Sequence, residues 1–241
     1  MKRLWLAGVL AVAAVTPAAT QPNDIRVRLY WLQPPPTVLL VVKPSEAQVR
    51  LCSPCTNAPA ANSFEVKAVG NQVEVHPASA GGPGGWQGES VEVEGSYRLE
   101  VPGQLPLRLT VPLFVRAHHD QLLLTVALPL EDYVAGVLAG ESSVFSSAES
   151  LKAMAVTARS FAARFRGRHQ SEGFDFCDTT HCQDLRLTAV TLRLQEAAQA
   201  TEGELLWFEG EPAATYYHRH CGGTTEAGRF QIGRASCRER V

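Results

Sequence analysis

The stretch that most constrains the fold is Leu128–Phe165, LPLEDYVAGVLAGESSVFSSAESLKAMAVTARSFAARF, because it has the periodicity of two consecutive helices. In its first half, four apolar residues recur at helical spacing and share one face: Leu130, Val134, Val137 and Leu138. Glu141 follows at the edge of that face, and Gly140 with Ser142–Ser143 favours an end to the helix beside it. The sequence therefore predicts a carboxylate at a helix end, which is either solvated or held against apolar neighbours.

The second half predicts its own helix start and a long buried stripe. Ser146 with Glu149 three residues later has the pattern of a capping box, and the helix should end near Gly167. Arg159 and Arg164 are predicted to lie off the stripe, which consists of Leu151, Met154, Ala155, Ala158, Phe161, Ala162 and Phe165. Together the two helices form a predicted hairpin that presents Glu141.

Residues 21–104 are β-rich and loop-rich. Ile25–Leu32 alternates polar and apolar residues, and several further short runs with the same period are separated by Pro, Asn and Gly. Leu105–Leu128 continues with strands around a predicted hairpin tip at His118–Asp120, whose histidines are interpreted as solvated. The fold class is therefore α+β: an N-terminal β-rich region, then a mixed domain over 105–231 with a helical hairpin packed on antiparallel strands.

The two ends of the chain are excluded from this domain. Residues 1–20 have the basic start, short apolar run and small residues of a secretory signal, with an uncleaved N-terminal anchor as the alternative. Residues 232–241, IGRASCRERV, resemble the translation of a sequencing adapter, so we interpret them as a scar on a C-terminally truncated domain. The expected location is the periplasm or cell envelope.

The charge balance argues against nucleic acid as a partner. The chain has 22 Lys and Arg against 24 Asp and Glu, a formal net charge of −2. Such a balance creates no global field that would attract a polyanion.

Two groups of cysteines have different interpretations. Cys52 and Cys55 form a CSPC pair, for which a local disulfide is favoured. Cys177, His181 and Cys182 lie within six residues on a polar loop, with His169 upstream. They suit either a tetrahedral metal site or a Cys177–Cys182 disulfide, and the sequence leaves both open.

The C-terminal part is predicted to contain a third helix over Thr188–Ala200, followed by two strands, GELLWF and ATYYHRH. These strands lead into a glycine turn at Cys221–Thr225. Alternation along the second strand would bring some of its aromatic and histidine residues to one surface: Tyr216, Tyr217, His218 and His220.

Four ordered blocks resemble the sporulation stage II protein D (SpoIID) family, which is also grouped with the amidase enhancer LytB. The blocks are LPLEDYVAGVLAGE, ESLKAMAVTARSFA, CDTTHCQ and ATEGELLWFEGEPAATYYHRHCGGTT, spread over roughly residues 105–230. Ser142–Ser143 stand where the family usually has Met-Pro.

The resemblance implies a set of functional residues. It carries the family's catalytic glutamate onto Glu141, and it places Arg159, Tyr217 and His218 in the substrate groove. It also implies that zinc binds the cysteines matching Cys177 and Cys182, with His181 and, more weakly, His169.

The resemblance further implies an exported lytic transglycosylase that cleaves peptidoglycan glycan strands and leaves 1,6-anhydromuramoyl ends. The alternative is a non-catalytic wall-binding module that enhances an N-acetylmuramoyl-L-alanine amidase. In both cases the expected partner is peptidoglycan glycan, with a cell-wall amidase as a further partner in the second.

Overall fold

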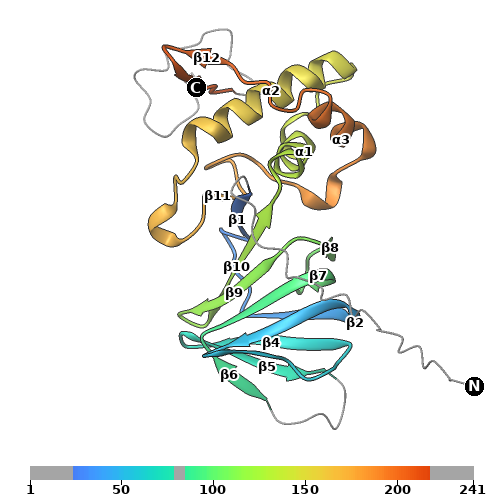
Figure 1. The fold of residues 1–241 in the computed structure, drawn as a ribbon, viewed down its shortest axis with the longest axis vertical. Helices are drawn as coiled ribbons and strands as arrows, with labels where there is room; N and C mark the ends of the chain where they lie inside the picture. The colour runs from blue at the N-terminus through green and yellow to red at the C-terminus, as the bar shows by residue number, and fades with distance from the viewer. Residues whose placement is uncertain (1–23, 79–84, 218–241) are drawn as a thin grey trace, which may run out of the picture.

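The computed structural model describes residues 24–78 and 85–217. The predicted signal segment (1–20), His218, the predicted glycine turn (221–225) and the segment interpreted as a scar (232–241) lie outside these ranges. The described residues form an α+β fold, with one large, mostly antiparallel sheet at one end and three helices at the other (Figure 1). None of the described helices is both long and apolar enough to cross a membrane.

The large sheet has eleven strands in the order β11-β1-β10-β9-β7-β2-β4-β5-β6, with β3 on β2 and β8 on β7. All its pairings are antiparallel except that of β1 with β11. The strands are β1 Ile25–Leu29, β2 Thr37–Cys52, β3 Cys55–Asn57, β4 Ser63–Val69, β5 Gln72–Pro77, β6 Trp86–Gly88, β7 Ser90–Glu100, β8 Leu107–Leu109, β9 Leu113–His118, β10 Gln121–Leu128 and β11 Phe176–Cys177.

The strands form where the sequence alternates, because every second side chain enters the core. In β4, for example, Phe64, Val66 and Ala68 are buried while the residues between them are exposed or half-buried. Two predicted strands, TVLLVV and QVRL, are instead one long strand, β2, whose register shifts between Val42 and Ala47.

The irregular part of β2 depends on a glycine in the facing strand. Gly95 has φ +93°, and a Cβ there would lie 2.2 Å from the Glu46 carbonyl oxygen. Only a residue without a side chain permits this approach. The period-2 pattern could not show that one strand would continue through Lys43–Glu46.

The first strand ties the N-terminal region to the helical end. β1 pairs with β10 in the register Ile25↔Leu128 and runs parallel to β11, with Arg28 opposite Cys177. We predicted a strand over Ile25–Leu32, but it ends at Leu29, since Tyr30 turns the chain with φ +54°. The sheet also continues across the predicted boundary at residue 105, because β7 pairs with both β8 and β9.

The helices confirm the predicted hairpin and add a third partner. They are α1 Leu130–Glu141, α2 Ala148–Phe165 and α3 Leu192–Gln199, and each packs against the other two. Two short 3-10 turns, Gln170–Glu172 and Leu187–Ala189, lie in the connecting loops. A small hairpin, β12 Trp207–Phe208 with β13 Glu211–Pro212, follows α3.

The start of α2 differs from the prediction by one residue. The N-cap is Ser147, whose side chain accepts a hydrogen bond from the backbone N–H of Ser150, so Ser146 and Glu149 make no capping box. The apolar stripe is buried as predicted, except that Phe165 is only half-buried. Gly167, with φ +78°, follows the end of the helix.

The burial of Arg159 contradicts a second prediction about α2. It was expected to lie off the buried stripe, but it is completely buried. Its Nε donates to Glu131 of α1 at 2.9 Å, and its other nitrogens donate to Thr201 and to the carbonyl oxygens of Ala198 and Glu204. Because a buried charge needs a partner, the guanidinium joins all three helices from within.

The C-terminal part is less regular than predicted. The third helix begins at Leu192 rather than Thr188, and within the described part of the chain the strand pairing after it is limited to the four residues of β12 and β13. Residues 214–217 form no strand, so Tyr216 and Tyr217 are placed by a loop.

Two local predictions are confirmed. Cys52 and Cys55 form a disulfide between β2 and β3. His119 and Asp120 form the tip of the β9–β10 hairpin, and both have positive φ.

Candidate active site

Glu141 is the last residue of α1, and two neighbours determine how the helix ends there. Gly140 is part of the helix, whereas the sequence predicted that it would help to end it. A Cβ at this position would lie 2.1 Å from the Asp184 carbonyl oxygen. Ser142 caps the helix, since its backbone N–H and its hydroxyl both donate to the Leu138 carbonyl. The missing side chain at Gly140 therefore allows the loop over 178–187, here called the cysteine loop, to lie directly against the end of α1.

This close packing fixes the Glu141 carboxylate. Its Oε1 accepts a hydrogen bond from the backbone N–H of Asp184 at 3.0 Å, and the residue is half-buried. Burial raises the pKa of Glu141 above its ordinary value; the Asp184 N–H opposes the shift and the Asp184 carboxylate reinforces it. A raised pKa keeps more of the acid protonated near neutral pH, as a proton donor requires.

A hollow of about 860 Å³, here called the Glu141 hollow, opens beside this carboxylate. Its walls come from the end of α1 and the loop after it, from α2, from the loop after β1, and from the cysteine loop. Six aromatic or histidine side chains line it: Trp31, Phe145, Phe161, His181, Tyr216 and Tyr217. Apolar rings beside a half-buried acid are suited to a ligand with both apolar faces and hydroxyl groups.

Tyr217 belongs to a chain of hydrogen bonds below the hollow. Gln183 is buried, and its amide nitrogen donates to the Tyr217 hydroxyl at 2.9 Å while its amide oxygen accepts from the Tyr133 hydroxyl at 2.9 Å. Burial, followed by the charge of Glu141, raises the pKa of Tyr217. Tyr217 therefore keeps its proton, which remains available to donate into the hollow.

Arg159, the other predicted substrate-binding residue that the structure describes, is not part of this arrangement. Tyr216 lines the hollow, but its ring also packs on Phe161 and Phe165, with centroids 6.3 and 5.6 Å apart. Arg159 does not line the hollow, because it is enclosed between the helices. His218 lies outside the described residues.

All four predicted metal ligands come together at one side of the hollow. The ligand atoms of His169, Cys177, His181 and Cys182 lie within 4.8 Å of one another. The Cys182 sulfur is 3.4 Å from Nε2 of His169 and 3.7 Å from Nδ1 of His181, and the Cys177 sulfur is 3.6 Å from the latter. In a tetrahedral zinc site with usual bond lengths, sulfur and nitrogen ligands stand about 3.6 Å apart, so the spacing fits.

The surroundings of the cluster also suit a metal. Nδ1 of His169 lies 2.7 Å from Glu172, the carboxylate–histidine contact that orients many metal-binding imidazoles. Cys177 and Cys182 are unpaired thiols, and the hydrogen bond between their side chains lowers the pKa of Cys177 and raises that of Cys182, which favours a thiolate at Cys177. A thiolate is the form that binds zinc.

Comparison with known proteins identifies the part of the chain that contains these residues. Residues 118–208 match the family model of SpoIID, described as Stage II sporulation protein. This stretch is therefore similar to the SpoIID family. An uncharacterized protein of Brachyspira hyodysenteriae (strain ATCC 49526 / WA1) is 32% identical over 118 residues, which cover 48% of this chain. The match covers only 32% of that relative, so the chain spans about a third of its length.

The matched stretch contains Glu141, Arg159 and the four cysteine and histidine residues, whereas Trp31 and Tyr217 lie outside it. Sequence reasoning missed Gln183 and Asp184, although both directly follow Cys182. Their position after a predicted ligand was a usable signal, since residues flanking a ligand are held near the same site. No local pattern indicated that Trp31 would reach the hollow.

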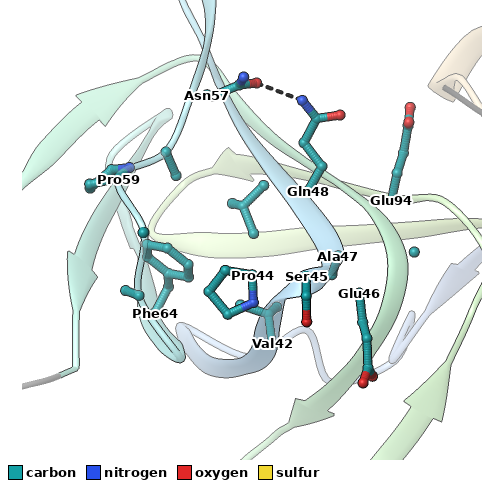
Figure 2. A pocket seen from close by; sticks show the side chains of 15 residues that line it. Val42, Pro44, Ser45, Glu46, Ala47, Gln48, Asn57, Pro59, Phe64 and Glu94 are labelled. Carbon is teal, nitrogen blue, oxygen red and sulfur yellow. Dashed lines mark hydrogen bonds between the residues drawn. The ribbon is translucent and has the colours of Figure 1, made fainter. Parts of the chain in front are cut away.

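A separate hollow lies outside the stretch that matches SpoIID, in the sheet, between the irregular part of β2 and the segment leading into β4 (Figure 2). Its two carboxylates already have partners, since Glu46 pairs with Lys43 at 2.9 Å and Glu94 with Arg50 at 2.8 Å. Gln48 and Asn57 bond to each other across its edge at 2.8 Å. This hollow therefore offers no free acid or base, and the Glu141 hollow is the candidate active site.

Proposed function

We propose that the protein is an exported peptidoglycan lytic transglycosylase in which Glu141 is the only catalytic acid and base. The observation that carries the proposal is a half-buried carboxylate with a raised pKa, fixed at the end of α1 in an aromatic-lined hollow. The SpoIID match supports a role in the cell wall. Export is inferred from the N-terminal sequence alone.

In this proposal, Glu141 first donates a proton and then accepts one during cleavage. Protonated Glu141 donates to the bridging oxygen of the glycosidic bond, and the bond from that oxygen to the anomeric carbon breaks. The resulting carboxylate removes the proton from the 6-hydroxyl of the same muramoyl ring, whose oxygen bonds to the anomeric carbon. The products are a free hydroxyl on one fragment and a 1,6-anhydro ring on the other, without consumption of water.

The second carboxylate in the hollow, that of Asp184, differs from Glu141 in having a cationic partner among the described residues. Asp184 forms an ion pair with Arg186 at 2.9 Å, so its charge is already partnered. Hydrolysis with two carboxylates would require one of them to activate a water molecule. The ion pair of Asp184 and the raised pKa of Glu141 favour the reaction with a single acid.

Tyr217 and Gln183 serve to bind and orient the sugar. The Tyr217 hydroxyl accepts from Gln183 and can donate its own proton to a substrate oxygen, such as that of an N-acetyl group. The buried Gln183 fixes the direction of that donor, because it is bonded on both sides. Arg159 has a structural role in this proposal, since its nitrogens are bonded to the three helices.

We further propose that His169, Cys177, His181 and Cys182 hold a structural zinc ion. Bound zinc would supply stability, not a reacting group, because four protein ligands leave it no open position. The protein's own contribution is to fix the cysteine loop, which carries both the Asp184 N–H that bonds Glu141 and the Gln183 amide that bonds Tyr217.

The test is digestion of denuded glycan strands with wild-type protein and with Glu141→Gln. Glutamine keeps the size of the side chain but cannot donate the proton, so anhydro-ended products should fall by at least about 100-fold. Binding of the strands without products from either protein would favour the alternative, a wall-binding module that enhances an amidase. Equal product from both proteins would exclude Glu141 as the acid.

A further inference from the structure

Trp31 stands where two hollows meet. Beside the Glu141 hollow lies a second one, of about 930 Å³, between the loop after β1, the segment around β8 and the cysteine loop; we call it the distal hollow. The two share five residues: Trp31, Leu32, Thr179, Thr180 and Asp184. They are therefore neighbouring parts of one groove.

The backbone at Trp31 is fixed by a single carboxylate. Asp178 accepts the backbone N–H of Tyr30 at 2.6 Å and that of Trp31 at 3.2 Å. Tyr30 has φ +54°, a conformation that is unfavourable for a bulky residue and persists only where the surroundings enforce it. This turn directs the chain away from β1 and toward the groove.

The indole ring is fixed as well. It stacks on His181, with centroids 5.0 Å apart and planes 24° apart, and meets His169 edge-on at 5.8 Å. Trp31 is nevertheless only half-buried, and it lines both hollows. A half-exposed aromatic ring held in this way is pre-organised for a ligand, since little side-chain freedom remains to be lost on binding.

The distal hollow has the chemistry of a carbohydrate site rather than of a polyanion site. Its lining combines apolar residues, Pro34–Pro36 and Leu105, with neutral hydrogen-bonding groups such as Thr180 and Gln104. Its charged groups are two aspartates and one arginine, with that arginine, Arg186, paired to Asp184. Sugars combine apolar ring faces with many hydroxyls and therefore match such a lining.

We propose that Trp31 stacks on a sugar ring, so that a glycan strand runs from the Glu141 hollow past Trp31 into the distal hollow. This inference rests on the proposed function and extends it, because stacking on Trp31 would make the protein selective for long glycan strands. It assigns a substrate-binding residue to the N-terminal region, since Trp31 lies outside the SpoIID match.

The experiment measures binding of glycan strands of graded length by calorimetry, in the Glu141→Gln background so that no strand is cleaved. Affinity should increase with length until both hollows are filled. Trp31→Ala should weaken the binding of long strands roughly ten-fold and that of the shortest strands much less, whereas Trp31→Tyr should retain most of the affinity. Trp207→Ala is the matched control, because Trp207 is 63% exposed and lines neither hollow.

Zinc content and melting temperature of each variant separate lost stacking from a disturbed cysteine loop, since Trp31 contacts His181 and His169. Both should be unchanged in Trp31→Tyr. Wild-type affinity and length dependence in Trp31→Ala would overturn the inference and leave the proposed function intact. Absence of any glycan binding or cleavage by the wild-type protein would overturn both.

Discussion

The carboxylates of the sheet and Glu141 of the groove are held in opposite ways. On the sheet, carboxylates pair with neighbouring cations: Glu92 and Glu94 both contact Arg50, at 2.7 and 2.8 Å, and Glu100 contacts Arg98 at 2.6 Å. In the groove, Glu141 has no ion-pair partner among the described residues and is held instead by a backbone N–H.

This difference between paired and unpaired carboxylates points to Glu141 as the group suited to a reaction. Paired charges on an exposed sheet contribute little to stability. A carboxylate kept half-buried without a countercharge is costly, and this cost is typical of groups whose pKa matters for a reaction. The groove also gathers the cluster of thiols and imidazoles, to which β11 contributes Cys177, whereas Cys52 and Cys55 on the far part of the sheet form a disulfide.

The largest effect on stability should come from replacing Arg159. Unlike the exposed ion pairs of the sheet, the pair of Arg159 with Glu131 contains a charge that is completely buried. Arg159→Ala leaves Glu131 without its partner between the helices, and should lower the free energy of unfolding by about 3–5 kcal/mol. The matched control is Arg164→Ala on the same helix, whose pair with Glu211 is exposed and should be worth at most about 1 kcal/mol.

Chemical denaturation of both variants measures the difference. A loss of activity in Arg159→Ala at full stability would contradict the structural role and return Arg159 to the substrate groove.

Removal of metal should be the next largest effect. If zinc is held at about 100 times its dissociation constant, its loss lowers the free energy of unfolding by about 2.7 kcal/mol. Chelation should therefore lower the melting temperature of the wild-type protein, and zinc should restore it. Cys182→Ser should respond to neither treatment, whereas the Cys52–Cys55 disulfide in the sheet should survive chelation unchanged. A stoichiometric zinc content in Cys182→Ser would contradict the assigned ligand set.

Gly140→Ala tests the close packing that fixes Glu141. The new methyl would lie 2.1 Å from a backbone oxygen of Asp184, which cannot move aside without displacing the cysteine loop. We expect a loss of about 1–3 kcal/mol in stability, together with lower activity. Gly136→Ala is the control on the same helix, because its methyl would meet the flexible end of Leu185 at 2.6 Å. An equal effect of both variants on activity would show that the position of the Glu141 carboxylate does not depend on the Asp184 backbone.

The smallest effect concerns stability as a function of pH. Since the pKa of Glu141 is raised in the folded protein, the folded state binds the proton more tightly than the unfolded chain. Its contribution is therefore most favourable below the unfolded pKa and is lost as the pH rises through the folded pKa. Glu141→Gln should remove this loss, so that the variant is slightly more stable than wild type near neutral pH. Parallel pH profiles of the two proteins would contradict the raised pKa.

Local sequence patterns predicted those structural features that depend on residues close to one another in the chain. Helical periodicity gave the stripe of α2 and placed Glu141 at the end of α1, and the spacing of Cys177, His181 and Cys182 predicted a cluster. What could not be predicted depends on distant contacts. Arg159 is polar and was placed outside the core, since its partner Glu131 becomes adjacent only when α1 packs on α2.

The same reason explains Trp31. It reaches the groove because β1 pairs in parallel with β11, almost 150 residues later, and because Asp178 then turns the chain at Tyr30. In the sequence, Tyr30 and Trp31 continued the alternation of a strand, and nothing nearby indicated a turn. The loop that holds Tyr216 and Tyr217 likewise follows a pattern that predicted a strand.

The most direct measurement of the central claim is digestion of denuded glycan in water labelled with heavy oxygen, followed by mass spectrometry of the new ends. If Glu141 alone gives and reclaims the proton while the sugar's own hydroxyl attacks, every new muramoyl end is an anhydro ring without label. New reducing ends that carry the heavy oxygen would show that water attacks, and would contradict the account by requiring a second working carboxylate.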